Sequence, residues 1–129
     1  MKSFIRQFAL VALMASAACN SQRAVDSTLP ERAADITGTI TRVQAAGGSS
    51  TRDVVLVEEI PGNLQSGGAK ANITVSAATR VFESSGGELK SIAFPELRIG
   101  MRARAWFEWP VAESYPVQGT AAVIVVERS

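Results

Sequence analysis

The stretch Met101-Arg102-Ala103-Arg104-Ala105-Trp106-Phe107-Glu108-Trp109 alternates between apolar and polar residues everywhere except at Trp106. Successive side chains of a β-strand point to opposite faces, so a period of two predicts a strand with one buried face. The core face comprises Met101, Ala103, Ala105, Phe107 and Trp109. The opposite face carries Arg102, Arg104, Trp106 and Glu108. This stretch therefore predicts an amphipathic strand whose outer face carries charged side chains and an indole that could contact a ligand.

Four other stretches have the character of strands. Residues 36–43 are rich in β-branched residues, and residues 71–77 alternate between apolar and polar. Residues 53–60 and 119–127 are apolar on both faces at their centres, as strands inside a closed sheet are. Glycine-rich turns separate these stretches, and Gly38 within the first of them predicts a bulge or sharp bend.

The order of these elements predicts the fold class. Three strands come first, then a Ser-Ser-Gly-Gly turn at 84–87 and a helical turn over 94–100, then the last two strands. An open sheet this apolar would expose adhesive edges, so closure is expected. We therefore predict an all-β domain over residues 35–129, a small five-stranded OB-like barrel with one short helical turn.

The N-terminus resembles a bacterial lipoprotein signal. Lys2 and Arg6 precede an uncharged run over residues 8–18, and small residues lead directly to Cys19, the single cysteine. The run is shorter than the roughly 20 apolar residues that span a bilayer. In lipoproteins the sulfur of the corresponding cysteine is diacylated, the peptide is cut before it and the new amino group is acylated, which predicts lipid attachment at Cys19. Conventional cleavage after residues 15–17 and an uncleaved anchor are the alternatives.

This resemblance implies a domain plan and a location. Residues 1–18 are the predicted lipoprotein signal peptide, residues 19–34 a flexible tether, and residues 35–129 the barrel domain. The expected location is the bacterial cell envelope, with the chain anchored through its lipid. Asn20 follows the cysteine, and by the same resemblance this favours the outer membrane, facing the periplasm, in a Gram-negative host.

Composition excludes several classes of function. The chain has no histidine and one cysteine, so a Ser-His-Asp triad, a Cys-His pair and the usual zinc sites cannot be built. We predict no metal and no cofactor. Without residues 1–18, 11 basic and 12 acidic residues remain, which is not the charge of a nucleic-acid-binding domain. The expected partners are the membrane, through the lipid, and an envelope protein or small ligand.

The outer face of the strand over residues 101–109 is the first candidate surface. Arg104 and Trp106 are neighbours on that face and are expected to stack. Together with Arg102 and Glu108 they could hold an anionic or planar ligand. The alternative is a solvated face whose arginines pair with acids across the sheet.

The loop that follows is the second candidate surface. Two prolines bracket Glu113-Ser114-Tyr115 and stiffen it. These residues either present a ligand or partner site at the barrel mouth, or cap the turn while Tyr115 covers the core with its hydroxyl paired. A small hydrolase using Glu108, Glu113 and Tyr115 as acid and base groups is a further alternative, although no catalytic motif supports an enzyme.

The segment Pro110-Val111-Ala112-Glu113-Ser114-Tyr115-Pro116-Val117-Gln118, with Gly100 to Trp106 before it, is similar to the YobA-like (DUF3221) family of small bacterial lipoproteins. Ile36-Thr37-Gly38-Thr39-Ile40 resembles the early part of that family. One departure is Trp109, where the family usually has glycine. The resemblance implies a lipoprotein with a small barrel and no known reaction. We therefore expect a membrane-anchored binding or envelope-accessory module, or a purely structural component of an envelope complex.

Overall fold

The computed structural model describes residues 28–47, 50–60, 68–109 and 111–128. Its regular elements are seven strands and one 3-10 turn. They are β1 (Ile36–Gln44), β2 (Asp53–Glu58), β3 (Lys70–Val75), β4 (Arg80–Ser85), β5 (Glu88–Ser91), η1 (Phe94–Glu96), β6 (Arg102–Phe107) and β7 (Val117–Glu127). The all-β class predicted from the sequence is confirmed, and η1 lies within the predicted helical turn.

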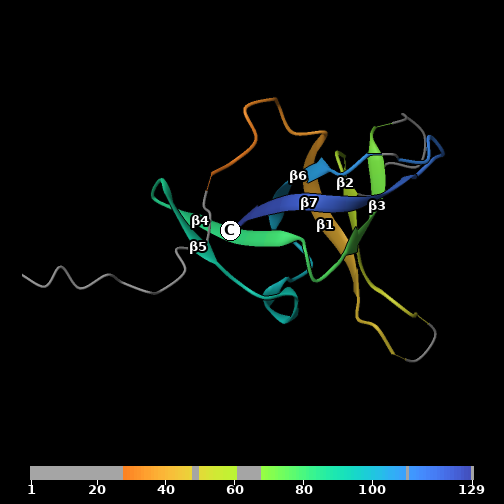
Figure 1. Ribbon diagram of the computed structural model, residues 1–129, viewed down its shortest axis with the longest axis horizontal. Coiled ribbons are helices and arrows are strands. Elements are labelled where there is room, and N and C mark those ends of the chain that lie inside the picture. Colours follow the sequence, from red (N-terminus) through yellow and green to blue (C-terminus); the bar gives the residue numbers. More distant parts are fainter. Residues whose placement is uncertain (1–27, 48–49, 61–67, 110, 129) are drawn as a thin grey trace, which may run out of the picture.

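Five of the strands close into a barrel (Figure 1). The ring runs β1-β2-β3-β7-β6 and returns to β1, and the β3–β7 contact that closes it is parallel. The other four contacts in the ring are antiparallel. The predicted five-stranded OB-like barrel is therefore the architecture of this domain, and closure leaves no free edge among these strands.

Strands β4 and β5 form a hairpin outside the ring. The long strand β7 pairs with β3 through its first half and with β4 through its second half. Gly86 and Gly87 both have positive φ, 58° and 89°, as the tight turn between β4 and β5 requires. The sequence predicted a turn here but not its strands, because their apolar runs are short. They form strands because Phe82 and Leu89 pack on the outside of the barrel.

Two apolar clusters hold these layers together. The inner cluster fills the barrel, and Met101, Ala103, Ala105 and Phe107 belong to it as predicted. The outer cluster joins Phe82, Trp106, Val123 and Val125, with Leu29, Ala34, Leu89 and Ala122 packed against it. Strand β7 is therefore apolar on both faces because it lies between the two clusters.

The irregularity predicted at Gly38 lies a few residues further along β1. The β1–β2 register shifts between Ile40 and Arg42, so the bulge is there. Gly38 itself lies where β1 passes closest to β2, because a Cβ atom at this position would lie 2.3 Å from the backbone oxygen of Glu58. The glycine is needed for close approach of two backbones.

Residues 28–34, which we call the strap, lie against the barrel rather than apart from it. Leu29 and Ala34 pack on the outer cluster. The indole Nε1 of Trp106 donates a hydrogen bond to the Arg32 carbonyl at 2.8 Å, and Arg80 donates one to the Thr28 carbonyl. This part of the predicted tether is thus attached to the domain. The predicted signal peptide, Cys19 and the rest of the tether lie outside the described residues.

Candidate functional site

The outer face of β6 differs from the open surface expected of it. The predicted stacking is present, with the guanidinium carbon of Arg104 5.6 Å from the centroid of the Trp106 ring. Trp106 itself is only 3% exposed, because the strap and the β4–β5 hairpin cover it. Its indole is a structural anchor for the strap and is not accessible to a ligand.

Arg102 and Glu108 lie at the two ends of that face. Arg102 is exposed and stands opposite Glu127 of β7 in the β6–β7 register. Glu108 is exposed beyond the end of β6, and its backbone N–H still bonds to the Thr120 carbonyl. The four predicted residues of this face are therefore not gathered around one point, since Trp106 is buried between the exposed ends.

The β6–β7 loop, residues 108–116, is folded back on the start of β7. Ala112 and Gln118 exchange backbone hydrogen bonds, and the Ser114 hydroxyl donates to the Pro116 carbonyl at 2.7 Å. The Tyr115 hydroxyl donates to the Gly68 carbonyl at 2.9 Å, which ties the loop to the chain before β3. Ser114 is thus a turn residue, as one reading of the sequence predicted.

Close packing of this loop depends on Gly119. A Cβ atom there would lie 2.8 Å from a methyl carbon of Val111 and 3.3 Å from the Phe107 ring. The absence of a side chain lets the loop lie directly on β7. The described part of the loop after residue 110 is therefore held by backbone bonds and by packing.

Two large aromatic side chains project from this ordered loop. Trp109 is 70% exposed and Tyr115 is 61% exposed. We call them the aromatic pair. The prediction that Trp109 belongs to the core is wrong, because β6 ends at Phe107 and the alternation of faces no longer applies two residues later. Tyr115 has the paired hydroxyl that the sequence predicted, but its ring does not cover the core.

A charged pair lies beneath the ring of Tyr115. Lys70 Nζ is 3.1 Å from Glu58 Oε1 and 5.8 Å from the Tyr115 ring centroid. The nearby Thr41 hydroxyl, the bond from Lys70 and the charge of Lys70 lower the pKa of Glu58 below its ordinary value, although burial opposes this. Lys70 is thereby committed to Glu58 and to the aromatic ring.

Asp35 fastens the strap to the same end of the barrel. Its carboxylate accepts two bonds of 2.7 Å from Arg32 and one from the Phe107 N–H. Burial raises the pKa of Asp35, but the Arg32 and Phe107 bonds and the Arg32 charge outweigh it, so the pKa lies below its ordinary value. Arg32 also donates to the Phe107 carbonyl.

A small hollow opens at the barrel mouth beside Tyr115. Its volume is about 100 Å³, and its walls are mainly apolar. The lining residues are Asp35, Ile36, Ala69, Lys70, Ala71, Phe107, Tyr115 and Val117. Glu113 and Glu108 do not line it, so the acid and base groups of the hydrolase alternative do not converge on this hollow.

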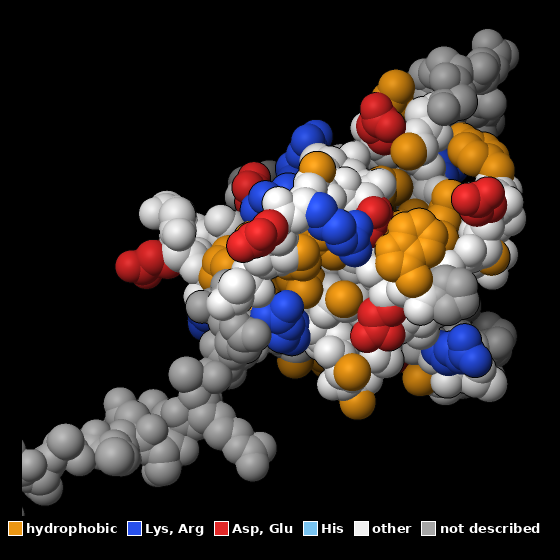
Figure 2. Space-filling model, turned by 45° about the horizontal axis from the view of Figure 1, so that its top comes forward, with side chains coloured by type: hydrophobic (Ala, Val, Ile, Leu, Met, Phe, Trp, Pro, Cys, Tyr) orange, Lys and Arg blue, Asp and Glu red, His pale blue; other side chains and the backbone are white. Residues whose placement is uncertain are grey.

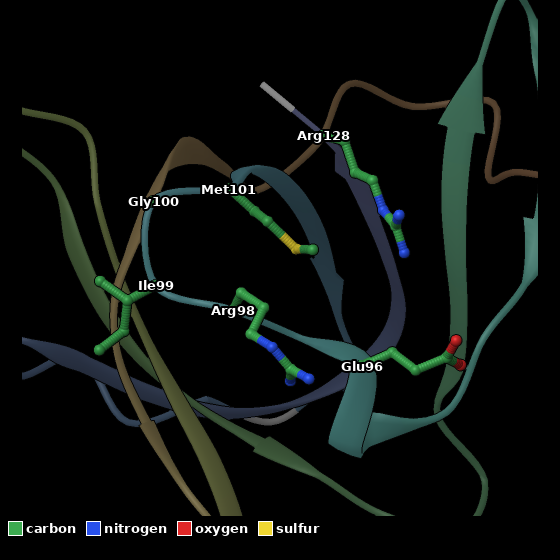
Figure 3. A pocket seen from close by; sticks show the side chains of 6 residues that line it. All are labelled: Glu96, Arg98, Ile99, Gly100, Met101 and Arg128. Carbon is green, nitrogen blue, oxygen red and sulfur yellow. The ribbon is translucent and has the colours of Figure 1, made fainter.

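A larger hollow lies at the turn before β6 (Figure 3). Its volume is about 480 Å³, and it is lined by Glu96, Arg98, Ile99, Gly100, Met101 and Arg128. The side chains of Arg98, Met101 and Arg128 point toward the open space, while Ile99 points away from it (Figure 3). Arg98 donates to the Pro95 and Leu97 carbonyls and Arg128 pairs with Glu83, so both guanidinium groups already have acceptors.

Within the described ranges, no three acidic, cysteine or histidine side chains gather as metal ligands would. The same residues contain no helix with the length and apolar character needed to cross a bilayer.

No protein-family model, curated protein or solved structure matches this chain.

The sequence pattern indicated Tyr115, Glu108 and Glu113 as candidate residues. It did not indicate Trp109, Glu59 or Ile60. Trp109 was assigned to the core by extending the alternation one step too far. The signal that separates it is the proline that follows, since proline has no N–H to donate to a strand ladder. Glu59 and Ile60 follow β2 and reach this surface only through the tertiary fold, so no pattern in the sequence marks them.

Proposed function

We propose that this protein is a membrane-anchored bacterial lipoprotein whose small β-barrel is a binding or accessory module of the cell envelope. We propose further that the barrel binds a partner protein through the aromatic pair on the β6–β7 loop. The first part rests on the lipoprotein signal and the resemblance to YobA-like lipoproteins. The second rests on the geometry of the loop.

The anchor follows from the sequence before the barrel. Cys19 ends the apolar run and, as the single cysteine, has no other cysteine in the chain with which to form a disulfide. Acylation accounts for a single cysteine at this position. More than one acyl chain anchors a protein stably to a membrane, whereas binding through one chain is marginal.

The single observation that carries the docking proposal is the exposure of Trp109 and Tyr115 on an ordered loop. Tryptophan and tyrosine are enriched among residues that dominate binding energy at interfaces. A loop already held by backbone bonds loses little conformational freedom on binding. Trp109 belongs to no cluster of buried residues, so its exposed ring is not needed to complete the core.

The position of the loop agrees with an anchored module. In Figure 1 the strap begins near the β4–β5 hairpin at the left, and the β6–β7 loop lies at the right end of the long axis. The chain toward Cys19 continues from Thr28, so the aromatic pair is at the opposite end of the barrel from that exit. A domain arranged in this way can present the loop to a partner away from the anchor.

The same geometry favours docking over the alternatives. A hydrolase would need Glu108 and Glu113 to face a common substrate, and neither lines the hollow beside Tyr115. A structural role through the Trp106 face would need an accessible indole, and Trp106 is buried.

The test is to express the full chain in a bacterial host with a clickable fatty-acid analogue and to recover it from membranes after reversible crosslinking. Label and membrane fraction should both be lost in Cys19→Ser. The crosslinked partner band should be lost in the Trp109→Ala/Tyr115→Ala double variant, which keeps its label.

Ile99→Ala is the matched control, because Ile99 is an exposed apolar residue outside the docking loop. Retention of label by Cys19→Ser contradicts the anchor, and retention of the band by the aromatic double variant contradicts the docking site.

A further inference from the structure

Three exposed acidic residues lie close to the aromatic pair, either in the sequence or through the fold. Glu108 precedes Trp109 and Glu113 lies two residues before Tyr115, and both glutamates are exposed. Glu59, also exposed, reaches the same surface, where its Oε2 accepts a bond from the Ala69 N–H at 3.2 Å. We call these three glutamates the acidic rim.

The rim and the aromatic pair are connected through the chain before β3. Gly68 accepts the bond from the Tyr115 hydroxyl, and a Cβ atom on Gly68 would lie 3.3 Å from the side chain of Ile60. Ala69, the next residue, bonds to Glu59. Ile60 is itself an exposed large apolar residue. Glu59, Ile60 and Tyr115 are therefore parts of one surface rather than separate features.

Two basic residues at this end of the barrel are already paired with acidic residues. Lys70 pairs with Glu58, and Arg32 forms a two-point bond with Asp35. Within the described part of the chain, no ion pair engages a glutamate of the acidic rim. Arg102 is exposed and lines a hollow together with Glu59, so the negative charge left without a basic neighbour is that of Glu108 and Glu113.

This combination is visible on the face turned toward the reader in Figure 2. Large hydrophobic side chains stand out at the right-hand end, where Figure 1 places the β6–β7 loop, and acidic side chains lie beside them. Basic side chains also lie on this face, including at its right-hand end.

We infer that the partner segment recognised by this surface is cationic, with lysine or arginine side chains that lie on the aromatic rings between the rim carboxylates. The inference rests on the proposed docking function and names the chemistry of its partner. Aromatic faces attract ammonium and guanidinium groups, and carboxylates at the edge add charge complementarity and faster association. An acidic partner would place like charges opposite each other, which the same surface disfavours.

The probe is an array of random-sequence peptides that span a range of net charge. The full mature chain, in detergent micelles and detected through a C-terminal epitope, is applied at low salt. We expect its signal to rise with the number of lysine and arginine residues in the peptide. Replacing one rim residue, by Glu108→Gln or Glu113→Gln, should reduce the signal on cationic peptides about twofold to fivefold, as expected for exposed charge pairs. A higher salt concentration should also reduce the signal on cationic peptides.

Glu88→Gln is the matched control, because Glu88 is an exposed glutamate on the β4–β5 hairpin. It removes the same charge from the protein but not from this surface, so it should leave the signal unchanged. Circular dichroism confirms that each variant is folded.

The possible results separate the two proposals. A signal that depends on the aromatic pair but not on peptide charge overturns the cationic partner and leaves the docking site standing. A signal that is the same in the Trp109→Ala/Tyr115→Ala double variant overturns the docking site and the cationic partner together. A reduction by Glu88→Gln equal to that by the rim variants shows that only overall charge matters, and it also overturns the inference.

Discussion

Gly38 shows how one position in β1 constrains the barrel. The backbone of β2 passes so close that a side chain has no place, and the nearest atoms are backbone atoms of Glu58 and Glu59, which cannot rotate away. Gly68 is different, because the atoms nearest to its missing Cβ belong to the flexible side chain of Ile60. Two glycines of similar appearance in the sequence therefore have different structural roles.

We predict that Gly38→Ala destabilises the domain by about 1–3 kcal/mol, the usual cost of forcing an extra carbon into a packed site. Gly68→Ala should change the free energy of unfolding by no more than about 0.5 kcal/mol, as surface substitutions usually do. Urea unfolding followed by circular dichroism measures both. Equal stabilities of the two variants would show that β1 can move away from β2.

At the scale of elements, the strap and the β6–β7 loop use the two tryptophans in opposite ways. Trp106 holds the strap through its indole N–H and through the outer cluster. Trp109, three residues later, contributes to no cluster of buried residues and is exposed. Strand β6 therefore supplies a structural tryptophan from its outer face, and the loop after it supplies the one available for binding.

We predict that Trp106→Phe lowers the free energy of unfolding by about 1–3 kcal/mol, because it removes a buried hydrogen bond and part of a packed ring. It should also accelerate trypsin cleavage at Arg32, since the strap loses an attachment. Trp109→Phe is the matched control and should leave both unchanged. Rapid cleavage at Arg32 in the unmodified protein would contradict an attached strap.

For the molecule as a whole, two carboxylates link stability to pH. Asp35 attaches the strap and Glu58 lies under the β6–β7 loop, and both have a pKa below the ordinary value. A carboxylate whose pKa is lowered by folding stabilises the folded state at pH values above its unfolded pKa. That stabilisation is lost as the pH falls through the folded pKa, since the unfolded chain binds the proton first.

We predict that the free energy of unfolding is nearly constant above pH ~5 and decreases below pH ~4, near the unfolded pKa of these side chains. Asp35→Asn/Glu58→Gln should be less stable near neutral pH and should show a smaller decrease in acid. Glu31→Gln, an exposed change on the strap, is the control and should follow the unmodified protein. Parallel curves for the double variant and the unmodified protein, measured by urea unfolding across this pH range, would contradict this linkage.

Strand positions and inward-facing residues could be predicted because both depend on local rules. A period of two assigned Met101, Ala103, Ala105 and Phe107 to the core, and the structure confirms all four. Runs apolar on both faces indicated strands covered on both sides, and β7 is such a strand. The β4–β5 hairpin was incompletely predicted, because its strands depend on packing against Trp106 and Val125, which are distant in sequence.

The sequence by itself determined the all-β class, the closed barrel and a chemically distinctive loop at Glu113-Ser114-Tyr115, because alternation and turn residues act over short distances. Only the tertiary structure decided which surface is available. It buried Trp106 under the strap and exposed Trp109 beyond the end of β6. It also brought Glu59 and Ile60 to the side of Tyr115 through the chain before β3. Exposure depends on what distant segments cover, and a local pattern does not contain that information.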